Sequence, residues 1–257
     1  MSSCYRATPR TTPVRTLVSV VCTLTLLLLS PAPRAAPQEG TDFRTVVPPQ
    51  PTGQRNKIEV VEFFSYGCPH CARFSPLLNA WVAKLPADVV FRRVPVGFGR
   101  DAWVNLQRAY YALESTGDLT RLDGPLFHAI HEERKPLFDE SSIAEWVGNN
   151  GGNAEKFAAA YTSLGVNTQT FQADKMAEDF QIAGIPSLAV DGRYVALVPA
   201  SQDEAQGLST LLANTDQLIA RVRSERAAAK PAPASVTGPS APAAASSPAR
   251  TWGALRA

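Results

Sequence analysis

Hydrophobic positions along the chain follow two patterns, short dense runs and stretches with helical spacing. Two dense runs, Ile58–Phe64 and 89–96, are rich in β-branched and aromatic residues without polar alternation, which is typical of strands covered on both faces. Between them, apolar residues recur at helical spacing until Pro86 ends the pattern. These residues are Leu77, Leu78, Trp81 and Leu85. The order predicts two parallel strands joined by a helix in a right-handed crossover.

The pattern becomes wholly helical from residue 99 to 165. Asp101 is expected to cap a first helix, which ends at Gly117. The apolar face of this helix is formed by Trp103, Leu106, Tyr110 and Leu113. Gly, Asn and Pro separate three further predicted helices, at 125–133, 141–147 and 154–164. We therefore expect 99–165 to be a helical insertion in an α/β chain.

The segment that follows leads the chain back to the sheet. A helix at 167–180 precedes two short strands at 187–190 and 194–197, and Asp191-Gly192 between them is a strong hairpin signal. A short apolar segment much earlier in the chain, at 43–47, predicts a further edge strand. The three prolines that follow would stop a longer ladder.

A last helix is predicted to begin at a capping box of Ser201 and Glu204 and to end near Arg226. Its apolar stripe consists of Leu208, Leu211, Leu212, Leu218, Ile219 and Val222. Residues 227–257 are almost entirely Ala, Pro and Ser, so this tail is predicted to be disordered.

The N-terminal segment, 1–36, has arginines, then an apolar run at 17–29, then small residues and prolines. This order predicts a secretory signal peptide, with an uncleaved membrane anchor as the alternative. Residues 37–56 would then form an N-terminal segment that contains the edge strand. Two of the four cysteines, Cys4 and Cys22, lie in the signal segment. The mature chain would keep only two cysteines in an oxidising compartment, which favours a chemical role over a scaffolding one.

Those two cysteines form a Cys-Pro-His-Cys motif directly after the strand Ile58–Phe64. Pro69 is compatible with a first helical turn, so Cys68 should lie at the N-terminus of a helix. Free backbone N–H groups, the helix dipole and a protonated His70 would all favour its thiolate. Cys71 lies three residues on, on the same helical face, and can close a disulfide with an exposed Cys68. Such a pair suits thiol–disulfide exchange.

Other chemistry for this pair of cysteines is less favoured. A zinc site would need two more ligands from the three histidines and the carboxylates. An inert structural disulfide would cross-link almost no chain and stabilise little. His128 and His131 have the i, i+3 spacing of a metal-binding face, but no third ligand is evident, so we predict surface or packing roles and no metal or cofactor. The net charge of +2 leaves nucleic-acid binding open on composition alone, and no such partner is predicted.

The motif and its surroundings resemble the DsbA family of the thioredoxin superfamily. Phe63-Phe64-Ser65 before the motif and Gly184-Ile185-Pro186 far downstream match the family pattern, as does Glu62 six residues before Cys68. The resemblance covers roughly 43–226. It implies an α/β thioredoxin-like fold, made from 57–98 and 166–226, with an inserted all-helical subdomain at 99–165.

The resemblance also implies roles for three residues outside the motif. Pro186 would be cis and face the disulfide, and the backbone of Ile185 would pair with an extended substrate peptide. Glu62 would be a buried carboxylate that relays the Cys71 proton, with an ion-paired glutamate at a strand end as the alternative.

The function implied is that of a periplasmic thiol:disulfide oxidase that donates the Cys68–Cys71 disulfide to unfolded exported proteins. Cys68 would be the nucleophile and leaving thiolate, and Cys71 the resolving thiol. A quinone-linked, DsbB-like membrane protein would reoxidise the pair, and the protein is expected to be a monomer. A disulfide isomerase or reductase is the first alternative, although 38–56 is too short for the dimerisation domain that isomerases usually add. A redox-inert peptide-binding chaperone is the second.

Overall fold

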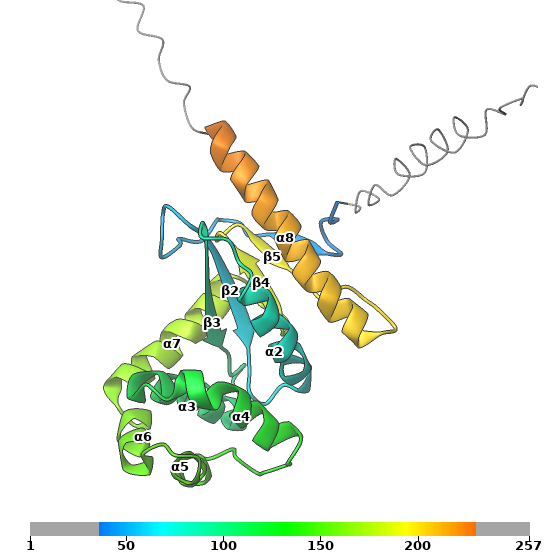
Figure 1. Cartoon of the computed structure of the whole chain (residues 1–257). Helices are drawn as coiled ribbons and strands as arrows, with labels where there is room; N and C mark the ends of the chain where they lie inside the picture. Colours follow the sequence, from blue (N-terminus) through cyan, green and yellow to red (C-terminus); the bar gives the residue numbers. More distant parts are fainter. Residues whose placement is uncertain (1–35, 230–257) are drawn as a thin grey trace, which may run out of the picture.

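The computed structural model describes residues 36–229, and a five-stranded sheet forms its centre. The strand order is β1-β5-β4-β2-β3 (Figure 1). The strands are β1 (Phe43–Thr45), β2 (Ile58–Phe64), β3 (Val89–Pro95), β4 (Ser187–Val190) and β5 (Tyr194–Ala196). Only β2 and β3 are parallel, and the other neighbours are antiparallel. The signal peptide and the tail lie outside the described residues, apart from residue 36 and residues 227–229.

The predicted strand–helix–strand unit is confirmed. All seven residues of β2 are buried, as expected for a strand between covered faces. Helix α2 (Pro69–Val82) follows β2 and returns the chain to β3, which pairs with β2 in parallel along its whole length. The edge strand β1 is confirmed too, beside β5. The site motif therefore lies where the central strand passes into α2.

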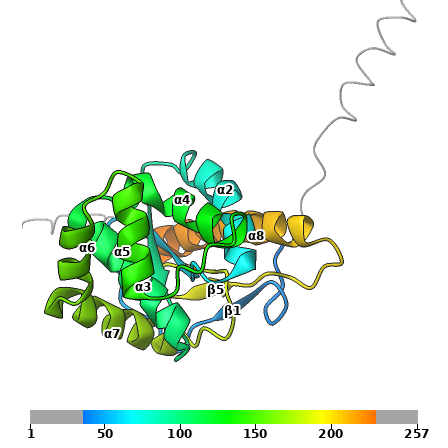
Figure 2. The same ribbon diagram turned by 90° about the horizontal axis from the view of Figure 1, so that it is seen from below.

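Helices cover both faces of the sheet. One core joins α2 to α8 (Glu204–Ala229) over Val60, Leu188 and Val190 of the strands. The other core lies beneath Val61 and Phe63 and contains most of the helical region. Figure 2 shows α2 and α8 on one side of the strands and α7 on the other. The helical region comprises α3 (Asp101–Thr116), α4 (Leu119–His131), α5 (Glu140–Asn149), α6 (Ala154–Tyr161) and α7 (Leu164–Asp179). None of the helices within 36–229 is long and apolar enough to cross a bilayer.

The Asp191-Gly192 hairpin between β4 and β5 is confirmed. Both residues have positive φ, 56° and 67°, which a tight hairpin of this type requires. At the second position a Cβ would also lie 1.9 Å from the Gln50 carbonyl oxygen, so only glycine fits. The turn therefore fixes how the N-terminal segment passes over the sheet.

Several helix boundaries differ from the predicted ones. Asp101 is the first residue of α3 and not its cap, which is Arg100, whereas Gly117 ends the helix in the left-handed conformation as expected. Helix α4 begins six residues before Pro125, because a buried apolar face outweighs the single hydrogen bond that a proline removes. Helix α7 begins at Leu164 because the Ser163 side chain caps it.

The predicted capping box at the start of α8 is wrong. The Asp203 side chain accepts hydrogen bonds from two backbone N–H groups of the first turn, those of Ala205 and Gln206. Ser201 instead accepts from the Asp203 N–H, and the Glu204 side chain points away to α2. The helix also runs past Arg226 to Ala229, so 227–229 are helical.

Candidate active site

The two cysteines of the motif lie at the start of α2 as free thiols. Cys68 is the N-cap residue, followed by Pro69 at the first helical position, and Cys71 lies in the first turn. The prediction that Cys68 is exposed is wrong, since Cys68 is only 3% exposed and Cys71 0%. The Cys68 Sγ lies 3.8 Å from the carbonyl oxygen of Ile185, so the segment before Pro186 covers it.

The surroundings move the pKa values of the two thiols apart. The Cys68 pKa falls to about 6, mainly because the Cys71 thiol donates a hydrogen bond to it. Backbone N–H groups at the helix N-terminus and the charge of His70 lower it further, against the effect of burial. The Cys71 pKa lies well above its usual value because of burial, then because of its bond to Cys68 and the nearby Glu62. One sulfur is thus suited to be a thiolate and the other a protonated thiol.

The imidazole of His70 lies on the exposed side of the motif and contacts two residues that the sequence did not single out. Its Nδ1 donates to Glu204 Oε1 at 2.5 Å. Arg73 donates to the same carboxylate at 2.8 Å, which links the first turn of α8 to the first turns of α2. His70 and Glu204 are 134 residues apart, so no local signal in the sequence could pair them.

On the buried side, Glu62 lies at 0% exposure beneath the cysteines and is close enough to raise the Cys71 pKa. Its Oε2 accepts from Arg93 of β3 at 2.5 Å, whereas Oε1 has no hydrogen-bond partner among the described residues. Burial raises the Glu62 pKa, and the charge of Arg93 acts in the opposite direction. Both expected properties of Glu62, burial and ion pairing, therefore occur together.

Arg93 joins this carboxylate to the helical region. It donates at 2.7 Å to Asp123 of α4, and the Tyr66 hydroxyl donates to the same carboxylate at 2.6 Å. The guanidinium carbon lies 4.0 Å from the ring centre of Phe64. Sequence reasoning missed these partners because they come from segments far apart in the chain, although an arginine within an apolar strand was a visible irregularity.

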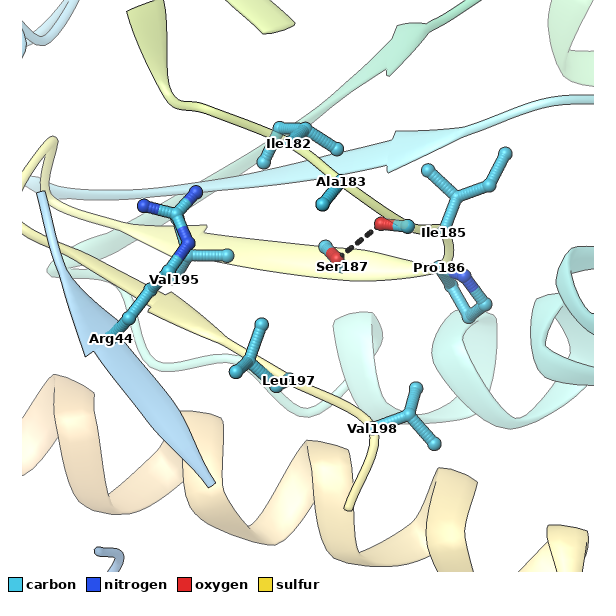
Figure 3. Close-up of a pocket in the computed structure, with 10 residues that line it drawn as sticks. Arg44, Ile182, Ala183, Ile185, Pro186, Ser187, Val195, Leu197 and Val198 are labelled. Carbon is cyan, nitrogen blue, oxygen red and sulfur yellow. Dashed lines mark hydrogen bonds between the residues drawn. The ribbon is translucent and has the colours of Figure 1, made fainter. Parts of the chain in front are cut away.

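The Ile185–Pro186 peptide bond is cis, as the family resemblance implied. Beside it lies a pocket of about 420 Å³ between this segment and strand β5 (Figure 3). The pocket is mostly apolar and is lined by Ile182, Pro186, Val195, Leu197 and Val198, with Arg44 at its far end. The Ser187 hydroxyl donates to the Gly184 carbonyl and holds the turn that leads into β4.

The glycine before Cys68 lies in close contact with the Trp103 ring. A Cβ on Gly67 would lie 2.5 Å from the Trp103 indole nitrogen, so the helical region packs directly against the start of the motif.

The two other histidines each contact a polar group of the protein. His131 Nε2 donates to the Tyr66 carbonyl oxygen at 2.7 Å, and His128 contacts Glu133 at 3.1 Å. Among residues 36–229, no three His, Cys, Asp or Glu side chains are grouped as metal ligands.

A dithiol pair at a helix N-terminus, facing a cis proline on a sheet of this topology, defines the class of thioredoxin-like thiol:disulfide oxidoreductases. Residues 59–211 match the DSBA-like thioredoxin domain. The thiol:disulfide interchange protein DsbA of Bordetella parapertussis is 37% identical over 83% of this chain and 98% of its own length. The corresponding protein of Pseudomonas aeruginosa is 38% identical over 74% of this chain and 87% of its own length.

Solved structures agree with these sequence matches. The crystal structure of Pseudomonas aeruginosa DsbA superposes with a TM-score of 0.68 at 36% identity, over 73% of this chain and 95% of that one. Oxidoreductase DsbA from Xylella fastidiosa gives a TM-score of 0.67 at 31% identity, over 74% and 100%. The chain belongs to the DsbA family and has its thioredoxin-like fold with an inserted helical region. It is an oxidoreductase of exported proteins with Cys68 and Cys71 as its CxxC pair.

Proposed function

We propose that this protein works in the periplasm as an oxidase, which donates the Cys68–Cys71 disulfide to newly exported proteins and returns to the dithiol. The observation that carries this direction is the position of Cys68 at the N-terminus of α2, where the Cys71 thiol, backbone N–H groups and the charge of His70 lower its pKa to about 6. A low thiol pKa stabilises the reduced form of the protein, so its disulfide is a strong oxidant.

The transfer takes two exchange steps. A substrate thiolate attacks Cys68 Sγ, the bond between the two cysteines breaks, and Cys71 leaves and takes up a proton. A second substrate thiolate then attacks the substrate sulfur of the mixed disulfide, and Cys68 leaves as the thiolate. The substrate loses two electrons and two protons; the protein gains the two electrons, Cys71 takes one proton, and the other proton is released to solvent. Cys68 is therefore the attacked sulfur and the good leaving group, while Cys71 resolves the mixed disulfide in the reverse direction.

Glu62 is proposed to carry the proton of Cys71. Its raised pKa, its burial beneath Cys71 and its Oε1, which has no hydrogen-bond partner within 36–229, suit a carboxyl that gives and takes a proton without solvent. Glu62→Gln should slow disulfide transfer at neutral pH while leaving the Cys68 pKa near 6. Unchanged transfer kinetics would reduce Glu62 to the role of an ion-pair partner of Arg93.

The substrate is proposed to lie along the segment that ends at cis Pro186. The Ile185 carbonyl beside Cys68 Sγ can accept a hydrogen bond from an extended peptide, and the apolar pocket of Figure 3 can take a neighbouring side chain. Main-chain pairing explains how one site would accept many sequences. A quinone-linked, DsbB-like membrane protein is proposed to reoxidise the pair, and the protein is proposed to act as a monomer.

The deciding experiment is the reduction potential of the Cys68–Cys71 couple, measured by equilibration with glutathione. An oxidase should have a potential well above the glutathione couple, so that the pair stays reduced at glutathione ratios that oxidise ordinary dithiols. A potential below that couple would favour a reductase, and a pair that does not exchange would favour a redox-inert chaperone.

A further inference from the structure

The His70 side chain is held from outside the motif by a carboxylate of α8. His70 Nδ1 donates to Glu204 Oε1 at 2.5 Å, and Arg73 donates to the same oxygen at 2.8 Å. The carboxylate of Glu204 is not needed to cap α8, because Asp203 already accepts from two backbone N–H groups of the first turn. Its contacts are instead made with the helix that begins at the redox pair.

The bridge places a negative charge between two cationic groups. Arg73 Nη2 lies 3.1 Å from His70 Nδ1, so a protonated imidazole would stand directly beside a guanidinium. Like charges at this distance repel, and a carboxylate shared by both removes that repulsion. Hydrogen bonds from Arg73 and then His70 lower the Glu204 pKa, so the carboxylate is ionised at neutral pH.

The charged groups that face His70 are Cys68 and Arg73 on α2 and Glu204 on α8. Among them, His70 acts on Cys68 by its charge, whereas Glu204 touches neither sulfur and acts on His70 and Arg73. Any effect of Glu204 on the thiolate should therefore pass through the imidazole.

We propose that Glu204 is a positioning residue of the redox centre. By bridging His70 and Arg73, it keeps the imidazolium of His70 in the first turn of α2, where that charge stabilises the Cys68 thiolate. The proposal rests on the oxidase function proposed above and on the effect of the His70 charge on the Cys68 thiolate, and it adds a residue from the far end of the sequence to the groups that set the oxidising strength of the disulfide.

Glu204→Gln tests the proposal in the full-length reduced protein. The Cys68 pKa, followed by the ultraviolet absorbance of the thiolate, should rise by about half a unit, because exposed ion pairs are weak. The potential of the couple should fall by about 15 mV, since one pKa unit corresponds to about 30 mV for two electrons. In a His70→Gln background, Glu204→Gln should change neither quantity.

Asp216→Asn provides the matched control. Asp216 of α8 accepts a hydrogen bond from the Trp81 indole of α2 at 2.9 Å, so it links the same two helices away from the redox pair. This variant should leave the Cys68 pKa unchanged. The proposal is overturned by no shift in Glu204→Gln, by an equal shift without His70, or by the same shift in Asp216→Asn. The pKa is measured on the reduced protein in the absence of substrate, so its outcome is independent of whether the protein oxidises or reduces its substrates.

Discussion

The two sulfur atoms of the motif lie three residues apart, yet their surroundings differ in nearly every respect. On the Cys68 side lie a helix N-terminus, an exposed imidazole and an exposed ion-pair cluster with α8. On the Cys71 side lie a buried carboxylate, a buried arginine and aromatic rings. One side stabilises negative charge on sulfur, and the other side disfavours it.

This difference shows how a nearly symmetric pair of thiols is given unequal roles. Accessibility is not what separates them, because both are buried in the dithiol form. The separation comes from hydrogen bonds and charge, since Cys71 donates to Cys68 and lies closer to Glu62.

The largest expected effect is a difference between the two cysteine variants. Cys71→Ser should accumulate mixed disulfides with exported proteins, because Cys68 remains a thiolate and nothing resolves the complex. Cys68→Ser should accumulate none, because the raised pKa of Cys71 keeps it a protonated thiol, which is not a nucleophile. Non-reducing gels of exported proteins would measure both, and equal trapping by the two variants would contradict the assignment.

The next effect contrasts the arginines of the two sides. Arg93→Met should reduce the free energy of unfolding by about 3–5 kcal/mol, because it leaves the buried Glu62 and Asp123 without their cation. Arg73→Met should cause no measurable change, because the Arg73 side chain is 51% exposed. Urea unfolding of both variants would test this. Equal losses of unfolding free energy would mean that burial of the arginine does not decide how much its ion pair stabilises the protein.

A third effect is the pH dependence of stability in the two redox forms. The Cys68 pKa of about 6 lies below the unfolded value of about 8.5, so its thiolate stabilises the reduced protein most fully above pH 8.5. This stabilisation is about 1 kcal/mol at pH 7, one unit above the folded pKa, and it disappears as the pH falls through about 6.

The reduced form should therefore melt above the oxidised form at pH 7, and the gap should close at pH 5. The raised Cys71 pKa has the opposite effect and destabilises the reduced form, but only near and above the unfolded pKa of this thiol. It should therefore narrow the difference in melting temperature between the two forms at alkaline pH. Thermal melts of both forms across pH would measure the gap. An oxidised form that is more stable at pH 7 would argue against the oxidase.

The smallest effect comes from changing the dipeptide between the cysteines. Replacing Pro69-His70 by Gly-Pro removes the charge of His70 and should raise the Cys68 pKa by about one unit. The disulfide should become less oxidising by about 30 mV. Equilibration with glutathione would detect the change, and a potential that stays constant would mean that the dipeptide does not act on Cys68.

What the sequence predicted well was carried by local signals. The dense run before Cys68, the proline after it and the hairpin dipeptide each specify a neighbouring backbone geometry, and the structure has all three. The cis proline followed from the family resemblance and was confirmed. Helix starts were less predictable because a side chain that could cap its own helix can bind a group elsewhere instead. Glu204 is an example, since it binds α2 and does not cap α8.

The residues that sequence reasoning missed come from distant segments of the chain and meet only in the folded protein. Arg93 meets Glu62 across neighbouring strands, and Asp123 reaches the same guanidinium from the helical region. Such pairs depend on strand register and helix docking, which no periodicity encodes. The exposure of Cys68 was misjudged for the same reason, since the covering segment lies 117 residues away.

The position of Arg93 has a consequence for cooperativity. A single guanidinium from β3 binds carboxylates of the sheet and of α4, and it lies against the Phe64 ring with the Phe127 ring 5.6 Å away on the helical side. If the helical region opened away from the sheet, it would leave buried charges unpaired on both sides of the break. We therefore expect sheet and helices to unfold in a single transition, and amide hydrogens of α4 and β2 to exchange through the same global opening.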